Sequence, residues 1–418
     1  MKIKVVLRLI ITFLVDILFF TLLFFMVHHS QEKFDSQKLI DEAVNSSGFG
    51  AFQASEKKSI FRRILEFKVG KIFLVLGIVF LIIAGSGCLM AYRVNSTFDK
   101  VTGSKNSIVK SVIKMLPMGE HFFQILPVES ESELSAVERT KSGDLERLNI
   151  LLLGIRGIGD PNGGLLTDSI MVLSVKPETR EAAMISVPRD LYVKIPYHDY
   201  KHKINEVYAV GFSEGKNKNL TERSQKGLEY SKKAVSKITG LDIHYAVSVD
   251  FKAFEEIIDT LGGVTITLNR SFTEMNQFKE GIISLPAGTQ IIDGKTALLF
   301  VRARFSTSDF DRAKRQQQVL MSLKNKALSL GVMTDPLKII SILDSVGNHV
   351  RTDMELWEIQ EMAAMAKRVD GSKVKKKVFD TSEEGLLYSS RDEKGSYILL
   401  PEGDNFSRIQ EYCEGIFD

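Results

Sequence analysis

The sequence predicts an α/β protein with a layered α-β-α sheet domain, preceded by N-terminal transmembrane helices. After residue 147, short apolar runs bounded by Gly, Pro or charge alternate with helical stretches, which is typical of a sheet covered by helices on both faces. Within the first hundred residues, two long apolar stretches indicate a membrane. The length of 418 residues exceeds the usual single domain, although the 44% hydrophobic content is ordinary for a globular protein.

The two N-terminal stretches differ in how strongly they predict a membrane helix. The segment 71–92 contains about twenty consecutive uncharged residues, which is enough to span a bilayer. The segment 1–30 contains a comparable run, but Asp16 lies in its middle. An aspartate at the bilayer centre costs roughly 2.5–3.5 kcal/mol. We expect this first transmembrane segment to insert as well; a re-entrant segment or a translation start placed too far upstream is the alternative.

Basic residues set the expected orientation. Lysines and arginines crowd the chain ahead of the second stretch, whereas Arg93 and Lys100 stand alone beyond it. The positive-inside rule therefore places residues 31–70 in the cytoplasm as a polar loop, and everything after Tyr92 outside. Residues 93–146 are then an extracytoplasmic spacer that ends in a flexible polar stalk. The expected localisation is the cell membrane, with the bulk of the chain extracytoplasmic.

Composition and motif spacing argue against several functions. The only cysteines are Cys88 and Cys413, so no disulfide framework is expected. A formal charge of +3 is too small to indicate nucleic-acid binding. The glycines that follow the first expected strand neither match the dinucleotide fingerprint nor close a P-loop. Ser186 lacks the sequence context of a serine hydrolase nucleophile.

The globular part begins at residue 148, and its elements follow from the apolar pattern. The helical stretches 221–239 and 251–261 each end at a glycine. Residues 331–418 continue the pattern as a C-terminal α/β extension of the same domain or as a small appended lobe. The strands expected up to residue 330 are 148–153, 169–175, 182–187, 244–249, 264–268 and 298–305. The extension is expected to contain helices at 337–343 and within 353–370, strands at 374–379 and 397–400, and a terminal helix from Phe406.

The segment that follows residue 297 is the most informative for function. If its apolar run is a buried strand, the period of two puts Arg302 and Arg304 on one face. After a serine and threonine turn, Asp309 lies near a helix start, and Arg312 and Gln316 share one helical face because they are four residues apart. Clustered guanidiniums match phosphate oxygens bidentately, so this junction indicates an anionic, phosphate-bearing ligand. The alternative is a solvated helix start with surface ion pairs.

Further charged residues stand where strands are expected to end. Asp168 opens the second strand, Arg189 and Asp190 follow the third, and Lys203 and Asn205 follow a loop rich in tyrosine and histidine. Ligand sites of open α/β sheets form at strand ends. A set of arginines with aspartates suits a metal-bridged pyrophosphate, in which Mg²⁺ takes oxygen ligands from aspartate and phosphate while arginines neutralise the remaining charge.

Seven motifs occur in an order that resembles the LytR-CpsA-Psr family of bacterial cell-envelope proteins. The resemblance covers residues 147–330 and weakens in the C-terminal extension. A membrane helix followed by an extracytoplasmic catalytic domain is also the layout that this family implies. The motifs are 149–154 (NILLLG), 167–175 (TDSIMVLSV), 185–192 (ISVPRDLY), 203–208 (KINEVY), 259–264 (DTLGGV), 293–304 (DGKTALLFVRAR) and 308–318 (SDFDRAKRQQQ).

The resemblance implies a phosphotransferase. Family members move a glycopolymer from a polyprenyl pyrophosphate carrier to a cell-wall acceptor, typically a peptidoglycan sugar hydroxyl, through a phosphodiester. The family also implies an apolar tunnel for the polyprenyl chain, and the sequence pattern does not separate a tunnel from a packed core. Phosphoryl transfer needs positioning and charge neutralisation more than covalent chemistry, which agrees with clustered arginines.

Matched motif by motif, the resemblance also implies a role for individual residues. Asp168 would hold Mg²⁺ (or Mn²⁺), and Asp309 would act as base or orient arginines, forming the catalytic set with Arg302 and Arg304. The resemblance further implies that the pyrophosphate is contacted by Arg189, Arg302, Arg304 and Arg312, with Gln316 and Lys203 in the surrounding polar shell.

The sequence departs from the family pattern in one loop. Many relatives carry an acid just after the first strand and an arginine immediately before the segment matching Thr167, where this chain has Arg156 and Leu166. Asp160 is an alternative metal ligand after a loop shift, and Arg156 is a cation that can restore the missing charge from the other side. Two other functions therefore stay open: a non-catalytic envelope regulator that binds polyprenyl phosphate, and a lipid pyrophosphate hydrolase.

Overall fold

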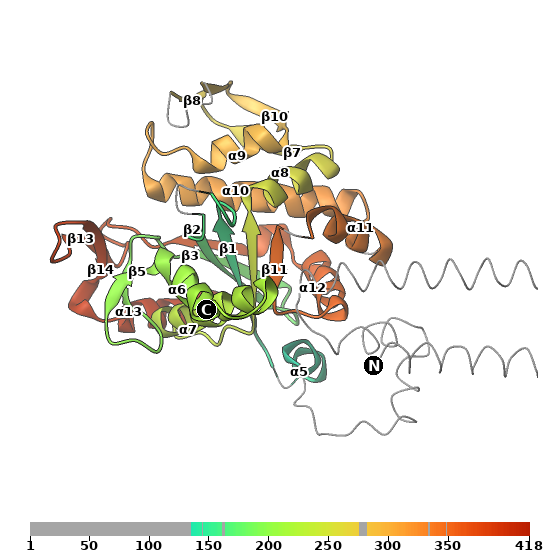
Figure 1. Cartoon of the computed structure of the whole chain (residues 1–418). Helices are drawn as coiled ribbons and strands as arrows, with labels where there is room; N and C mark the ends of the chain where they lie inside the picture. The colour runs from blue at the N-terminus through green and yellow to red at the C-terminus, as the bar shows by residue number, and fades with distance from the viewer. Residues whose placement is uncertain (1–134, 144, 161–163, 276–281, 333–334, 348) are drawn as a thin grey trace, which may run out of the picture. The chain divides into compact units, whose positions relative to one another are not determined.

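The computed structural model describes residues 135–143, 145–160, 164–275, 282–332, 335–347 and 349–418 (Figure 1). The predictions for residues 1–134, which include both membrane segments, the cytoplasmic loop and most of the spacer, lie outside these residues. Within the described ranges, no helix combines the length and the apolar character needed to cross a bilayer.

A mixed six-stranded sheet forms the centre of the described part, which confirms the α/β class. β1 pairs antiparallel with β2 and parallel with β6, while β12 runs parallel to β3. Both edge strands come from the chain after residue 330, so the C-terminal extension contributes to the sheet itself. In sheet order the strands are β11 (Val350–Thr352), β6 (Tyr245–Asp250), β1 (Leu148–Ile155), β2 (Thr167–Lys176), β3 (Glu181–Ser186) and β12 (Val374–Val378).

The period of two in β1 divides the core between the two faces of the sheet. Leu151, Leu153 and Ile155 pack on one side with residues of α6 (Val207–Glu214), α7 (Leu220–Thr239) and α13 (Ser407–Glu414). Leu148 and Ile150 pack on the other side with α12 (Leu356–Arg368) and α5 (Ala136–Ser142). Burial on both faces explains why the sequence shows a nearly continuous apolar run here.

Two glycines allow α6 and α7 to approach each other closely. A Cβ atom on Gly227 would lie 2.8 Å from the ring of Tyr208, and one on Gly211 would lie 2.7 Å from a backbone oxygen of α7. The Asn219 side chain caps the N-terminus of α7, and Gly240 ends the helix at φ 72°. The predicted helix 221–239 is thereby confirmed, whereas α6 was not predicted.

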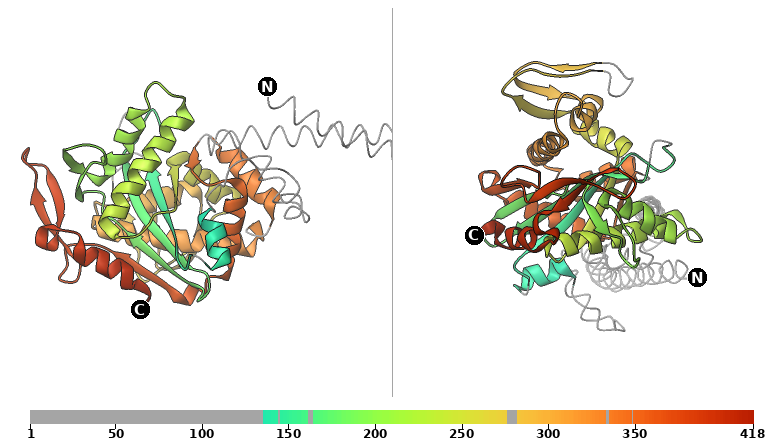
Figure 2. Two further views of the ribbon diagram at one scale, coloured as in Figure 1. Left: turned by 90° about the horizontal axis from the view of Figure 1, so that it is seen from below. Right: turned by 90° about the vertical axis from the view of Figure 1, so that its left-hand side faces the viewer.

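A second layer lies beyond the sheet edge at which β1 ends. It contains α8 (Phe251–Thr260), α9 (Gly294–Arg302) and α10 (Asp309–Ser329), which share an apolar cluster with two short ribbons. Figures 1 and 2 show these ribbons on the far side of α9 and α10 from the central sheet. The ribbons are β7 (Val264–Leu268) with β10 (Gly288–Ile292), and β8 (Phe272–Glu274) with β9 (Ile283–Leu285). The predicted strand 264–268 therefore forms, but in a ribbon outside the central sheet.

The predicted strand 298–305 is wrong, because this segment ends a helix. The Asp293 side chain accepts a hydrogen bond from Thr296 N and caps α9. Ala297, Phe300 and Val301 are buried at helical spacing. A short apolar run fits a buried helix as well as a strand, and the cap decides between them. Arg302 is thus the last residue of α9, and Arg304 lies in the turn before α10.

The C-terminal part contains the expected helices and strands. α11 (Pro336–Val346), α12, β12, β14 (Tyr397–Pro401) and α13 are confirmed, and β14 pairs with the unpredicted β13 (Leu387–Arg391). One further unpredicted hairpin joins β4 (Tyr192–Lys194) and β5 (Lys201–Lys203). The prediction of a flexible stalk is wrong for residues 136–142, which form α5. Val137 of this helix is fully buried, and its N donates to Tyr245 Oη.

A buried acid under α5 makes stability depend on pH. Glu358 of α12 is only 4% exposed and accepts hydrogen bonds from Tyr245 Oη (2.5 Å) and Glu355 N (2.6 Å). Burial, above all, raises the pKa of Glu358. A raised folded-state pKa contributes stability that is complete below the unfolded value near 4.5 and is lost as pH rises through the folded pKa.

Glu358→Gln is therefore expected to raise Tm at neutral pH and to bring no gain below pH 4.5. Thermal unfolding of both proteins across this pH range measures the difference. Glu361→Gln, a partly exposed position of the same helix, is the matched control. A Glu358→Gln gain that does not change with pH would contradict the argument.

Candidate functional site

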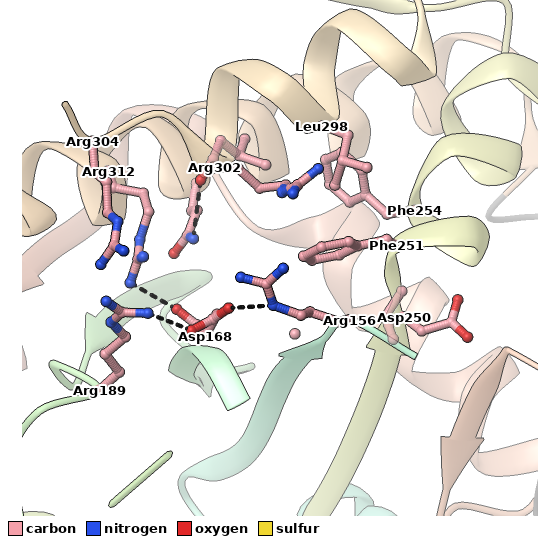
Figure 3. A pocket seen from close by; sticks show the side chains of 14 residues that line it. Arg156, Asp168, Arg189, Asp250, Phe251, Phe254, Leu298, Arg302, Arg304 and Arg312 are labelled. Carbon is pink, nitrogen blue, oxygen red and sulfur yellow. Dashed lines mark hydrogen bonds and ion pairs between the residues drawn. The ribbon is translucent and has the colours of Figure 1, made fainter. Parts of the chain in front are cut away.

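The site forms at the sheet edge where β1, β3 and β6 end and where β2 and β11 begin. Arg156 follows β1, Asp168 is the second residue of β2, and Arg189 follows β3. Because β2 and β11 run opposite to β1, their first residues meet the last residues of the other strands. The sheet topology alone thus brings together charged residues that are far apart in the sequence, as Figure 3 shows.

A cavity of about 120 Å³ opens between this edge and helices α8 and α9 (Figure 3). Its wall on the side of α8 and α9 includes Phe251, Phe254, Leu298 and Val301, while the sheet edge and α10 supply most of the polar lining. Among the described residues, the charged side chains that line it are Arg156, Arg189, Arg302, Arg304, Arg312, Asp168 and Asp250.

Asp168 is the centre of an ion-pair network on the polar side of the cavity. Arg189 Nη1 donates to Asp168 Oδ1 (2.5 Å), and Arg156 Nε lies 3.5 Å from Asp168 Oδ2. Arg312 Nη2 donates both to the backbone oxygen of Asp168 (2.9 Å) and to Asp309 Oδ2 (3.0 Å). One aspartate therefore orients three guanidiniums toward the same space.

Burial and the ion-pair network shift the pKa values of Arg189 and Arg312 in opposite directions. Burial by itself would lower the pKa of Arg189, but Asp168 and then Asp309 outweigh it, so the pKa is raised. Burial lowers the pKa of Arg312, whose side chain is almost completely enclosed, and Asp309 only partly offsets this. A guanidinium stays charged in either case, so both side chains present fixed positive charge to the cavity.

Asp309 and Arg189 also have unused hydrogen-bonding capacity. In the described part, Asp309 Oδ1 and Arg189 Nε are buried, 3.7 Å apart, and neither has a hydrogen-bond partner. The two atoms face each other at a distance longer than a hydrogen bond, so they form an ion pair without a hydrogen bond. A small second cavity lined by Asp168, Arg189, Asp309 and Arg312 lies beside them.

The ring of Phe251 supports two of the guanidiniums. Arg302 Cζ lies 4.5 Å and Arg156 Cζ 5.9 Å from its centroid. Phe251 is the first residue of α8, and its N donates to Arg156 O (3.4 Å). Asp250 Oδ1 caps the helix, and its Oδ2 lies 2.6 Å from His349 Nδ1. Asp250 thus positions α8 rather than presenting a free carboxylate to the cavity.

Arg315 holds the turn that carries Arg302 and Arg304. It is buried in α10 and donates from Nε to Phe300 O (2.9 Å), from Nη1 to Thr307 Oγ1 (3.0 Å) and from Nη2 to Ala303 O. Burial lowers its pKa to about 10. Gln316 Nε2 adds a contact to Val301 O (3.3 Å), and its Oε1 accepts from Ser169 Oγ (3.0 Å).

The structure separates the expected residues into three groups. Arg189, Arg302, Arg304, Arg312, Gln316 and Asp168 line the cavity together. Asp309 and Lys203 stand behind it: Asp309 contacts Arg189 and Arg312, and Lys203 Nζ donates to Asp190 Oδ1 (2.6 Å), whose other oxygen lies 3.6 Å from Arg189 Nε. Asp160 lies in the loop after β1 and is not among the lining residues.

The residues around Asp168 do not fit the divalent cation that the family resemblance implies. At phosphate sites Mg²⁺ is held by one or two carboxylates together with waters and substrate phosphates, so an available carboxylate oxygen is the minimum that the protein must supply. Here both carboxylate oxygens of Asp168 already face guanidiniums. The role of Asp160 as a metal ligand stays a prediction.

Sequence reasoning missed several residues of this site. Phe251 and Phe254 were assigned only to an amphipathic helix, although their spacing puts both on one face directly after a strand end. Arg315 was not singled out among the basic residues of its helix, and no local signal marks it, because its partners are backbone oxygens of another segment. The pairing of Asp250 with His349 is also a tertiary contact without a sequence signature.

Comparisons with known proteins show which family and which fold this chain shares. The model of the LytR_cpsA_psr family matches residues 125–413. Over 222 residues the chain is 35% identical to the polyisoprenyl-teichoic acid–peptidoglycan teichoic acid transferase TagU of Oceanobacillus iheyensis, covering 52% of this chain and 62% of that protein. It is 33% identical over 225 residues to the cell wall biosynthesis protein LcpA of Corynebacterium glutamicum, covering 50% and 42%.

These matches span less than two thirds of the length of TagU and LcpA. Among solved structures, TagT bound to LIIa-WTA is similar, with a TM-score of 0.51, 22% identity, and coverage of 69% of this chain and 94% of that chain. At this identity the structural likeness shows a shared fold.

Proposed function

Because this chain belongs to the LytR-CpsA-Psr family, we propose that it is a membrane-anchored extracytoplasmic phosphotransferase. It moves a glycopolymer from a polyprenyl pyrophosphate carrier to a cell-wall acceptor, such as a peptidoglycan sugar hydroxyl. The names of its relatives support this class of reaction, since TagU is a transferase of teichoic acid from a polyisoprenyl carrier to peptidoglycan. Residues 71–92 are the proposed membrane anchor.

The observation that carries the proposal is the cavity, which has arginines on one side and apolar side chains on the other. A lipid diphosphate has a doubly charged bridge attached to a long apolar chain. The arginines on one side can bind phosphate oxygens, and the wall formed by Phe251, Phe254, Leu298 and Val301 can take the first part of the lipid. A soluble sugar phosphate would not need an apolar wall beside the charged groups. The volume of about 120 Å³ is smaller than most ligand pockets, so the full chain would require α8 and α9 to separate.

In the proposed reaction the acceptor hydroxyl oxygen attacks the phosphorus that carries the glycan. A new P–O bond forms, the bridging P–O bond breaks, and polyprenyl phosphate leaves with the electron pair of that bond. The hydroxyl proton passes to solvent. Charge develops on the phosphoryl and leaving oxygens, where Arg189, Arg302 and Arg304 can neutralise it without reorganisation.

Asp309 is proposed as a positioning residue. The family resemblance leaves a base and an arginine-orienting carboxylate as its two roles. One of its oxygens is bound to Arg312 and the other is buried next to Arg189, so neither is directed to a substrate hydroxyl. Orientation of Arg189 and Arg312 is the role that this geometry supports. The resemblance implies Mg²⁺, but both oxygens of Asp168 already face guanidiniums, and no step of the proposal depends on a metal.

Glycan transfer by the purified full-length protein tests the proposal. A synthetic polyprenyl diphosphate glycan and peptidoglycan are supplied in detergent, and phosphodiester-linked glycan and released polyprenyl phosphate are both measured. Arg302→Ala is expected to lower transfer by about 10²-fold because it removes one phosphate contact. Arg391→Ala, an exposed arginine of β13, is the matched control and should retain the wild-type rate.

Two other results would favour the alternatives. Release of glycan phosphate without any acceptor would indicate a lipid pyrophosphate hydrolase. Binding of the lipid with no product would indicate a non-catalytic regulator. Undiminished transfer by a folded Arg302→Ala protein would contradict the arginine clamp.

A further inference from the structure

Arg156 lies beside the carboxylate of Asp168, the residue that the family resemblance assigns to a metal. Its Nε is 3.5 Å from Asp168 Oδ2, the oxygen not occupied by Arg189. Figure 3 shows Arg156 and Arg189 approaching this carboxylate from opposite sides. A cation that used Asp168 as a ligand would have to displace one of the two guanidiniums. The arginine therefore competes directly with a metal for the same carboxylate.

Contacts within the protein fix the position of Arg156. Its side chain is only 29% exposed and lies against the ring of Phe251. Its backbone oxygen accepts from Phe251 N, which joins the end of β1 to the start of α8. Gly157, at φ 137°, follows immediately, and its N donates to Gly164 O (3.1 Å). A solvated surface arginine would have neither the aromatic support nor the fixed backbone.

The charge balance of the cavity also argues against a divalent cation beside Asp168. With Asp309, which contacts Arg189 and Arg312, five arginines and three aspartates of the described residues belong to the site, a formal charge of +2. A diphosphate esterified at both ends carries about two negative charges near neutral pH. These side chains thus balance the charge of the ligand before any metal is added. A divalent cation would leave an excess of positive charge in a partly buried site, which is unfavourable.

We propose that Arg156 replaces a divalent cation beside Asp168, so that the cavity binds a lipid diphosphate without Mg²⁺. The inference rests on the proposed function and concerns how this one site neutralises its substrate. Guanidinium and metal supply the same positive charge, but a guanidinium adds directed N–H donors and needs no oxygen shell.

Diphosphate binding in the presence and absence of metal tests the proposal. The probe is a geranylgeranyl diphosphate sugar, a diphosphate esterified at both ends, titrated calorimetrically into the full-length protein in detergent, either with EDTA or with excess Mg²⁺. For the wild-type protein, Kd is expected to differ by less than about twofold between the two conditions. Loss of binding in EDTA would overturn the proposal.

Arg156→Asp provides the complementary result, because it places a second carboxylate beside Asp168. This variant is expected to bind the probe at least about tenfold more weakly in EDTA and to recover affinity with Mg²⁺. Lys252→Asp makes the same charge change on an exposed side chain of α8 and should match the wild type. Wild-type affinity of Arg156→Asp in both conditions would overturn the proposal.

Direct metal binding is the second readout. Electron paramagnetic resonance of free Mn²⁺ should show no uptake by the wild-type protein without diphosphate and measurable uptake by Arg156→Asp. Uptake of Mn²⁺ by the wild type at Asp168, abolished by Asp168→Asn, would overturn the inference. The wild-type titrations decide the question even if Arg156→Asp fails to fold.

The outcomes separate this inference from the proposed function. Metal-dependent probe binding with intact glycan transfer would reject the role of Arg156 and retain the transferase. Metal-independent probe binding without transfer to peptidoglycan would retain Arg156 as the replacement cation and reject the transferase. Absence of probe binding in both conditions would reject both.

Discussion

Replacing Arg189 with alanine is expected to reduce glycan transfer by about 10³-fold, the largest effect of any single arginine in the cavity. Arg189 binds Asp168 at 2.5 Å, lies 3.7 Å from Asp309, and still has a buried Nε without a hydrogen-bond partner in the described part of the chain. It is thus the guanidinium that both aspartates orient. Its loss would remove the proposed phosphate contact and would leave two carboxylates without their shared partner.

Arg189→Lys separates charge from geometry. A lysine keeps the positive charge but cannot contact Asp168 and a phosphate oxygen through a fixed fork, so we expect it to recover only about tenfold of the lost rate. Steady-state rates with the lipid-linked glycan measure both variants, and Arg391→Ala controls for arginine loss elsewhere. A folded Arg189→Ala protein that transfers glycan at the wild-type rate would exclude a pyrophosphate clamp at this edge of the sheet.

Replacing Arg315 with methionine is expected to destabilise the fold by about 3 kcal/mol. Methionine replaces the apolar stem of the arginine without its guanidinium, so Phe300 O, Ala303 O and Thr307 Oγ1 lose their common donor. These acceptors lie in or near the turn between α9 and α10, where an unpaired carbonyl costs about 1–3 kcal/mol when buried. Arg302 ends α9 and Arg304 lies in this turn, so transfer activity should fall as well.

Equilibrium urea unfolding followed by the fluorescence of Trp357 measures the change, since it is the only tryptophan in the sequence and is largely buried in α12. Lys314→Met is the matched control because Lys314 is the preceding residue and its side chain is 63% exposed. Equal stability of the Arg315→Met and Lys314→Met proteins would show that the turn does not depend on Arg315.

Arg302 illustrates how a correct prediction of which residues converge can follow from a wrong prediction of local structure. The sequence predicted that Arg302 and Arg304 converge because they alternate along a strand. They do converge on one cavity, but from the last residue of α9 and the extended turn after it. Short apolar runs do not distinguish helix from strand, and the decision lies with the Asp293 cap and the cluster that buries Phe300.

For α5, by contrast, the sequence did not predict a helix that the structure forms. Its polar sequence predicted a stalk, because few apolar residues mark it. Val137 and Ala136 are nevertheless buried against the core that contains Tyr245 and Trp357. These buried side chains and the hydrogen bond to Tyr245 Oη are among the contacts that hold α5 on the domain, although so short a helix would not be stable alone.

By itself, the sequence determined the alternation of strands and helices, the family, and the identity of the arginines at strand and helix ends. These follow from apolar periodicity, caps and motifs, which are local properties of the chain. Only the tertiary structure decided which charged side chains contact one another. The sheet topology brings Arg156, Asp168 and Arg189 to one edge, and the contact of Arg156 with Asp168 opposes a metal there. Interactions between side chains so distant in sequence depend on strand order and helix packing, which no local pattern encodes.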